Sequence, residues 1–351
     1  MKHGALFISY ARADAIEFAT RLSNDLKRWG FAVWVDLSEL ENGALFDVSI
    51  ENAIQTSSIL LASMSKASLM DKSVCRDEIV FALNSGKQLL PLKIQSDVEP
   101  SLLLARRQWI DFSTSYDSGI EILLEFLQGN TARLNEPSVP IVDGVVPLDF
   151  SPEIARLTKR FTGRTWLFEQ IRNQLENAED NRPIVLVAEP GFGKSAIVAE
   201  LSFELDQEIA GLHFCTRRKT KTLSPSDFVA SLVAQMSVAI PEYGKIIKGL
   251  QENSLICSNP SDAFREFIVE PLRLTSQHCR RLVAIDGLDE AEDFEGETIA
   301  EVLGKHAIDL PDWLVLVITT RPENPVLRQL RHLNLYFLDA DATNNTLDVE
   351  E

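Results

Sequence analysis

An apolar run at residues 183–188 leads directly into the turn Glu189-Pro-Gly-Phe-Gly-Lys-Ser195, after which apolar residues recur at helical spacing. A buried strand, a glycine-rich turn and a helix in this order are typical of a phosphate-binding loop in an α/β fold with a parallel sheet. Gly191 and Gly193 allow backbone N–H groups to turn toward a phosphate, and the N-terminus of the helix adds partial positive charge. Lys194 can reach the β- and γ-phosphates of a nucleotide, and Ser195 can hold Mg²⁺.

Two later apolar runs end in charged residues. The first ends in Asp286, and an acidic side chain at the end of a buried strand is costly unless it faces something positive. We therefore expect Asp286 to hold the Mg²⁺ of the nucleotide and Asp289 or Glu290 to orient a water molecule. The second run, at 313–320, leads into Arg321, which could meet the γ-phosphate. A solvated acidic loop and an arginine on a surface turn are the alternative interpretations.

The segment that contains these motifs, about 160–340, resembles the NACHT branch of the STAND class of P-loop ATPases. The resemblance includes Phe161-Thr-Gly-Arg164 upstream of the loop, whereas Ala188 departs from it by standing where the pattern has its first glycine. It implies a switch that oligomerises on binding ATP and that turns ATP over slowly or not at all. The ATP-binding residues that it implies are Arg164, Gly191, Gly193, Lys194, Ser195, Asp286, Asp289, Glu290 and Arg321, with Ser195 and Asp286 as Mg²⁺ ligands.

The domain organisation follows from length and from proline content. A chain of 351 residues is too long for one ordinary domain. Four prolines fall within residues 131–159, where neither a helical nor a strand period persists, so we predict an extended linker there. It separates a domain at 1–130 from one at 160–351. We expect the second domain to be truncated at its C-terminal end, because residues 346–351 resemble a helix start, although a disordered acidic tail would have the same composition.

Strand and helix patterns alternate in both domains, which predicts parallel sheets with helices on both faces. In the first domain, strands are expected at 5–9, 31–36, 58–64, 88–94 and 108–112, with helices at 15–29 and 73–83. In the second domain, strands are expected at 183–188, 211–216, 281–286, 313–319 and 332–338, with helices following the phosphate loop and at 228–240, 263–274 and 297–306. Ligands of such folds bind beyond the carboxyl ends of the strands.

Three short motifs lie near those ends in the first domain. They are Phe7-Ile-Ser-Tyr-Ala-Arg12, Trp34-Val-Asp36 and the helix start Ser73-Val-Cys-Arg-Asp-Glu78. Their order and spacing resemble a TIR domain over about 4–128, which implies a flavodoxin-like parallel-sheet fold. TIR domains are either scaffolds that only associate or enzymes that cleave NAD⁺ between nicotinamide and ribose with one glutamate early in that helix. Glu78 matches the position of this glutamate.

Cleavage of that bond develops oxocarbenium character on the ribose, which a fixed carboxylate can stabilise. The resemblance implies that NAD⁺ contacts Ser9, Tyr10, Ala11, Arg12, Trp34 and Glu41. Other roles for these residues stay open. Trp34 lies in a strand and could belong to the core, Arg12 and Glu41 could be solvated loop residues, and Glu78 could be an ordinary exposed acid.

Charge and composition exclude several classes of function. The net charge is −18, and the acidity extends over both halves of the chain, so we expect no direct binding of nucleic acid. No apolar run approaches the roughly 20 residues of a membrane span, and the apolar stretch at 5–8 is shorter than the core of a signal peptide, so we expect a cytoplasmic protein without membrane contact. Four cysteines without paired spacing predict reduced thiols.

The two resemblances together predict a TIR effector fused to a nucleotide switch. ATP and Mg²⁺ binding would drive homo-oligomerisation through both domains, in response to an unknown trigger, and assembly would activate NAD⁺ hydrolysis in anti-phage defence. Two alternatives remain. One is a non-catalytic TIR signalling scaffold on the same switch, and the other is a plain P-loop ATPase with a passenger TIR domain.

Overall fold

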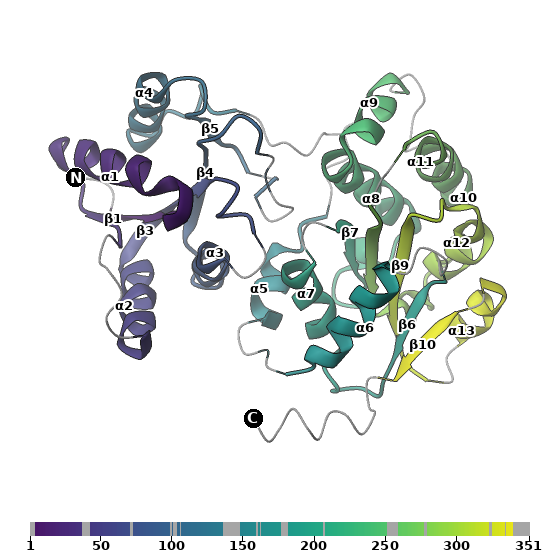
Figure 1. Cartoon of the computed structure of the whole chain (residues 1–351). Helices are drawn as coiled ribbons and strands as arrows, with labels where there is room; N and C mark the ends of the chain where they lie inside the picture. The colour runs from purple at the N-terminus through teal and green to yellow at the C-terminus, as the bar shows by residue number, and fades with distance from the viewer. Residues whose placement is uncertain are drawn as a thin grey trace. The chain divides into compact units, whose positions relative to one another are not determined.

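In this computed structural model the described residues are 4–36, 43–70, 73–98, 100, 104–105, 107–135, 148–158, 161, 163–176, 182–205, 208–250, 259–276, 279–322, 325–333 and 335–339. The chain divides into two compact units, 1–138 and 139–351 (Figure 1). Within the described ranges, no helix has both the length and the apolar character that crossing a membrane requires.

The first unit is built around one parallel sheet with the strand order β2-β1-β3-β4-β5. Its elements are β1 (Ala5–Ser9), α1 (Arg12–Arg28), β2 (Val33–Trp34), α2 (Gly43–Thr56), β3 (Ser57–Met64), α3 (Val74–Asn84), β4 (Gln88–Lys93), β5 (Ile110–Asp111) and α4 (Tyr116–Leu127). The predicted strands are therefore present, although β2 and β5 are shorter than the apolar runs that predicted them.

Strand alternation places helices on both faces of this sheet. Leu6 and Ile8 of β1 pack in a core cluster with residues of α1 and α4. Phe7, between them in sequence, points to the opposite face, where it packs with residues of α2 and α3. This two-sided burial confirms the α/β architecture predicted from the alternating strand and helix patterns.

The second unit contains a second parallel sheet, with the strand order β10-β6-β9-β8-β7. Its strands are β6 (Ile184–Val187), β7 (Ile209–Phe214), β8 (Arg281–Asp286), β9 (Leu314–Thr320) and β10 (Tyr336–Asp339). Its helices are α5 (Ser151–Thr158), α6 (Thr165–Glu176), α7 (Lys194–Glu204), α8 (Pro225–Ala239), α9 (Pro241–Gly249), α10 (Pro260–Phe264), α11 (Glu270–Arg273), α12 (Ile299–His306) and α13 (Pro325–Leu330). Short 3-10 turns connect them at Thr220–Thr222, Leu288–Ala291, Ala307–Asp309 and Arg331–Leu333.

The predicted linker and the last predicted strand differ in the structure. The C-terminal part of the expected linker at 131–159 forms α5, in which Ile154 and Ala155 are buried. Pro152 does not prevent this, because a proline in the first turn of a helix has no intrahelical N–H bond to lose. The strand expected at 332–338 begins only at Tyr336, since a 3-10 turn occupies Arg331–Leu333.

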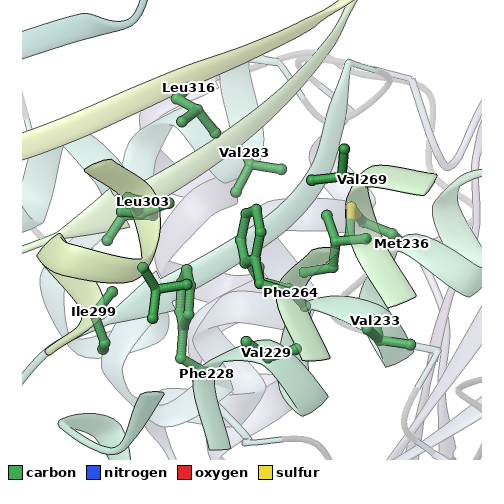
Figure 2. Close-up of a cluster of buried hydrophobic side chains, with 14 of the residues drawn as sticks. Phe228, Val229, Val233, Met236, Phe264, Val269, Val283, Ile299, Leu303 and Leu316 are labelled. Atoms are coloured by element: carbon green, nitrogen blue, oxygen red, sulfur yellow. The ribbon is translucent and has the colours of Figure 1, made fainter. Parts of the chain in front are cut away.

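The largest core of the second unit lies between the sheet and the helices α8 to α13. Figure 2 shows part of it, where Phe228 of α8 and Phe264 of α10 lie among aliphatic side chains from both layers. Their rings are stacked, with centroids 6.4 Å apart and planes inclined by 10°. This packing fixes the strands whose carboxyl ends carry the charged residues described below.

One element of this core departs from regular helix for an identifiable reason. The expected helix at 263–274 contains Pro271, and in the structure it includes a π-helical turn at Arg265–Val269. Proline has no N–H to donate to the carbonyl four residues earlier, that of Phe267. The buried hydroxyl of Tyr243 donates to this carbonyl instead, at 2.7 Å.

Tyr243→Phe should therefore destabilise the second unit by about 1–2 kcal/mol, because it removes a buried hydrogen bond to this carbonyl while preserving the ring. Denaturant unfolding of the full chain, monitored in the second unit, measures this change. An unchanged unfolding midpoint would show that the carbonyl finds another donor.

Candidate active site and nucleotide-binding site

In the first unit, the predicted residues at the end of β1 gather with the start of α3. Ser9 and Tyr10 are buried at the carboxyl end of β1, and Arg12 opens α1. Glu78 lies in the second turn of α3 and is partly buried. Glu78 is close enough to Arg12 and Ser9 for each to lower the pKa of its carboxyl group.

Asp36, just beyond β2, joins this group although the sequence analysis gave it no role. Its carboxylate accepts a hydrogen bond from Arg12 Nη2 in an ion pair, and its backbone carbonyl accepts one from the Tyr10 hydroxyl. The Asp36 side chain is only 14% exposed, so the pair is partly shielded from water. An acid directly after an apolar strand is the same signal that identified Asp286, and it could have identified Asp36.

The environment of Glu78 opposes its negative charge. Burial, together with the nearby carboxylates of Asp36 and Asp77, raises the pKa of Glu78 to about 8. A carboxyl group in this state is mostly protonated at pH 7 and becomes a better base and charge acceptor once ionised. The site therefore favours a cationic group near Glu78, because a cation would stabilise the ionised form.

Three other residues were predicted to contact NAD⁺, namely Trp34, Ala11 and Glu41. Trp34 is stacked on Phe7, with centroids 4.8 Å apart and planes 10° from parallel, and it packs against the core on the α2 and α3 face of the sheet. This arrangement favours the core role for Trp34. Ala11 is buried between Tyr10 and Arg12 and offers only its backbone. Glu41 lies outside the described residues.

In the second unit, the glycine-rich turn has a backbone that is compatible with phosphate binding. Gly191 and Gly193 have φ values of 91° and 78°, a left-handed region that is strained for residues with a Cβ atom. Lys194 Nζ donates to the carbonyl oxygens of Ala188 and Glu189, the latter at 3.0 Å. Ala188 itself keeps an ordinary negative φ, so the missing first glycine does not disturb the loop.

The predicted Mg²⁺ ligand Asp286 lies at the end of β8, where the neighbouring strand β9 supports it. Thr319 Oγ1 donates to Asp286 Oδ1 at 2.7 Å and accepts from the Gly287 backbone N–H at 2.8 Å. Burial raises the pKa of Asp286 to about 6, whereas the hydroxyls of Ser195 and Thr319 lower it. Thr319 thus joins the candidate site, although the sequence analysis gave it no role.

Asp289 and Arg321 form an ion pair, with Arg321 Nε 3.0 Å from Asp289 Oδ2. The Asp289 side chain is 7% exposed and that of Arg321 is 48% exposed. Glu290 accepts a hydrogen bond from the backbone N–H of Arg217 at 2.8 Å. The predicted γ-phosphate contact of Arg321 thus requires this ion pair to open or to turn.

Arg164 lies just before α6, with a left-handed backbone at φ 62°. Its carbonyl accepts from the Leu167 N–H at 2.9 Å and helps to begin the helix. Its assignment to the nucleotide site stays a prediction.

The family model of the TIR domain matches residues 6–124, which include Ser9, Arg12 and Glu78. The model of the N-terminal part of nephrocystin 3 matches residues 162–321, which include the phosphate loop and Arg321. Among solved structures, the TIR domain of the Toll-related receptor TRR-2 from Hydra magnipapillata is 20% identical, with a TM-score of 0.31, over 35% of this chain and 95% of that chain. Residues 6–124 therefore form a TIR domain, and a second α/β unit with its own parallel sheet follows it.

Proposed function

We propose that this protein is an NAD⁺ glycohydrolase whose TIR domain cleaves NAD⁺ with Glu78, under the control of ATP binding by the second unit. The observation that carries the proposal is the partly buried Glu78 carboxyl group, grouped with Ser9, Tyr10, Arg12 and Asp36 at the carboxyl edge of a TIR sheet. The match to the TIR family model supports a function in signalling or in NAD⁺ cleavage.

The proposed reaction breaks the bond between the ribose carbon and the nicotinamide nitrogen. Nicotinamide leaves as a neutral molecule, the positive charge passes to the ribose, and water adds to the sugar with release of a proton. An ionised Glu78 would stabilise the ribose charge in the transition state. The Arg12 guanidinium, paired with Asp36, lies where it could contact the pyrophosphate of the substrate.

Cys75 is a poor candidate for the nucleophile in this reaction. Burial and the nearby Glu78 carboxyl together raise the pKa of Cys75 to about 12, so the thiol stays protonated at physiological pH. The carboxylate of Glu78 is therefore the group to which we assign the chemistry.

The residues of the second unit fit ATP and Mg²⁺ in the chemistry of their donors. Gly191, Gly193 and the N-terminus of α7 offer backbone N–H groups to phosphate, and Lys194 would bind the β- and γ-phosphates. Ser195 and Asp286 supply a hydroxyl and a carboxylate, the hard oxygen ligands that Mg²⁺ prefers. The raised pKa of the buried Asp286 supports this fit, because a divalent cation would compensate the charge of its ionised form.

We infer that α5 carries the state of the nucleotide site toward the TIR domain. The Phe150 ring, just before α5, packs against His213 and Phe214 of β7, with centroids 5.4 Å apart in each case. Glu153 of α5 forms an ion pair with Lys219, which lies two residues after Arg217, the partner of Glu290. The loop after β7 therefore contacts both Glu290, through Arg217, and helix α5, through Lys219.

Lys219→Ala should weaken the dependence of nicotinamide release on ATP by up to about fivefold while leaving ATP affinity unchanged. The effect is small because Lys219 is 51% exposed, and exposed ion pairs contribute at most about 1 kcal/mol. The charge-swapped pair Lys219→Glu with Glu153→Lys should restore the dependence, and Lys221→Ala, on the same loop, is the matched control. If nicotinamide release by Lys219→Ala depended on ATP as strongly as that of the wild type, the proposed coupling through α5 would be rejected.

The proposed activity also predicts a pH profile. Because Glu78 must be ionised and has a pKa of about 8, kcat/KM for NAD⁺ should rise about tenfold per pH unit below pH 8 and level off above it. The cationic nicotinamide ring of bound NAD⁺ favours the ionised form, so kcat should level off at a lower pH than kcat/KM. Initial rates from pH 6 to 9.5 measure both, and a flat kcat/KM profile would contradict the assignment.

The experiment that tests the function as a whole uses the purified full chain with NAD⁺ and measures free nicotinamide, with and without ATP and Mg²⁺. Release that depends on ATP supports both parts of the proposal. Release that is independent of ATP rejects the gating, and no release under any condition favours the scaffold. Rapid turnover of ATP without nicotinamide release favours the plain ATPase.

Light scattering in the same samples tests the proposed homo-oligomer, and a role in anti-phage defence is tested by phage challenge of expressing cells.

A further inference from the structure

The sheet of the TIR domain contains two buried serines whose hydroxyls have no hydrogen-bond partner within the described ranges. Ser9 ends β1 and is 1% exposed, and Ser63 lies near the end of β3 and is 3% exposed. A buried hydroxyl without a partner costs about 1–3 kcal/mol. A buried hydroxyl without a partner at a candidate active site needs an explanation. A partner group that accepts the hydrogen bond in only one ionisation state would provide one.

Strand alternation decides what each serine faces. Phe7 of β1 packs with Ile79 and Ala82 of α3. Ser9, two residues further along β1, points to the same face and lies nearer the carboxyl end of the strand. It therefore faces the first two turns of α3, which carry Cys75 and Glu78.

The electrostatics of the two α3 residues agree with this placement. The Ser9 hydroxyl lies near enough to lower the pKa of both Cys75 and Glu78. In β3, Leu60, Ala62 and Met64 pack on the face of the sheet that α2 and α3 cover. Ser63 lies between Ala62 and Met64, and because side chains alternate along a strand it points to the opposite face. Of the two serines, only Ser9 points toward the catalytic carboxyl group.

The other charged and titratable groups around Glu78 come from the elements packed against it. Arg12 at the start of α1 is the cation, and it already forms an ion pair with Asp36. Two carboxylates, Asp36 after β2 and Asp77 on α3, oppose negative charge at Glu78. The hydroxyl of Tyr10, after β1, donates its hydrogen bond to the backbone carbonyl of Asp36. The Ser9 hydroxyl is thus a neutral donor that can turn toward a Glu78 oxygen when that oxygen becomes charged.

We propose that Ser9 is a positioning residue, whose buried hydroxyl donates a hydrogen bond to the ionised Glu78 carboxylate and holds it in the orientation that the reaction requires. The inference deepens the proposed NAD⁺ cleavage and rests on the role given to Glu78. It differs from the role implied by the TIR resemblance, in which Ser9 contacts NAD⁺ directly. A neutral donor beside the carboxyl group hydrogen-bonds more strongly to its ionised form than to its protonated form, so the contact strengthens when Glu78 loses its proton.

The direct test follows the ionisation of Glu78 in the full chain, without using catalysis. The chain is labelled with ¹³C-glutamate, and the carboxyl resonance of Glu78 is identified by its loss in Glu78→Gln. Ser9→Ala should raise the midpoint of its titration by roughly half a pH unit to one unit, because the ionised form loses a donor. Ser9→Thr, which keeps a hydroxyl and suits a strand, should restore the midpoint. Ser63→Ala, which removes the other buried hydroxyl of the same sheet, should leave it unchanged.

The activity measurement separates this inference from the proposed function. If the chain cleaves NAD⁺, the acid limb of the kcat/KM profile should move to higher pH in Ser9→Ala by the same amount as the resonance. A shifted resonance in a chain that releases no nicotinamide would uphold the contact and reject the glycohydrolase. An unshifted resonance in Ser9→Ala would overturn the inference, and so would a loss of activity that leaves both the resonance and the pH profile unchanged, since Ser9 would then act on the substrate.

Discussion

Glu78→Gln should lower nicotinamide release by a factor of about 10² to 10³ while leaving ATP binding unchanged. The substitution preserves the shape of the side chain but removes the charge that would face the ribose oxocarbenium, and a lost electrostatic partner of a transition state costs about 3–4 kcal/mol. Chromatographic assay of nicotinamide measures the first effect and isothermal titration with ATP the second. Undiminished cleavage of NAD⁺ would reject the catalytic role of Glu78.

Asp77→Asn is the matched control for this variant. Asp77 precedes Glu78 on the same helix but is exposed, and its charge raises the pKa of Glu78. Neutralising it should therefore keep the activity and move the acid limb of the pH profile slightly to lower pH. A loss of activity in Asp77→Asn as large as that in Glu78→Gln would indicate that the helix start, and not the Glu78 carboxylate, had been damaged.

The stability of Glu78→Gln should distinguish a lost catalytic group from a lost fold. The pKa of Glu78 is raised from an ordinary value of 4.5 to about 8, so the folded state holds a proton that the unfolded state releases. Wild-type stability consequently falls as the pH rises from about 4.5 to about 8, by roughly 2–3 kcal/mol at pH 7 after allowance for the partial exposure of the residue. Gln carries no charge, so the variant should be more stable than the wild type at pH 8 and inactive, and denaturant unfolding at pH 5 and pH 8 tests this.

Lys194→Ala should lower the affinity of the second unit for ATP by about 10- to 100-fold and should abolish the ATP dependence of NAD⁺ cleavage. The loss corresponds to one charge-assisted contact with phosphate, worth about 1.5–3 kcal/mol. In the structure the Lys194 ammonium group donates to the carbonyl of Glu189 at 3.0 Å, so the loop already holds this side chain at its centre. Titration with ATP in the presence of Mg²⁺ measures the affinity.

Lys248→Ala, which removes an exposed lysine of α9, controls for the change in net charge. It should bind ATP like the wild type. If Lys194→Ala also bound ATP and assembled like the wild type, the glycine-rich turn would not be the nucleotide site, and the gating proposed for the second unit would fail with it.

The local elements of this protein could be predicted from its sequence because their causes are local. The apolar strands, the helical periods and the backbone of Gly191 and Gly193 depend on residues a few positions apart. Asp286 could be predicted as a candidate site residue because a carboxylate that ends a buried strand needs a partner wherever the strand lies. Glu78 was identifiable by its place in a motif, although its pKa was not.

The prolines of the predicted linker show where local patterns are insufficient. Four prolines between 131 and 159 favour an extended segment, but Pro152 lies in the first turn of α5 and is compatible with it. The helix is stabilised by burial of Ile154 and Ala155, which a sequence pattern of eight residues cannot reveal. Tertiary packing therefore overrode the local signal, as it commonly does for short helices.

Only the tertiary structure decided which side chains meet. The ion pair of Arg12 with Asp36 and the hydrogen bond of Thr319 with Asp286 join residues 24 and 33 positions apart in the sequence. Each pair exists because parallel strands that are neighbours in the sheet end at the same edge, and strand order and register result from the burial of both faces of the sheet at once. The same packing stacks Trp34 on Phe7, and it turns Ser9 toward Glu78 while Ser63 faces the other way. The sequence thus determined which chemical groups are present and on which elements they lie, and the packing of the sheets determined which of those groups can act together.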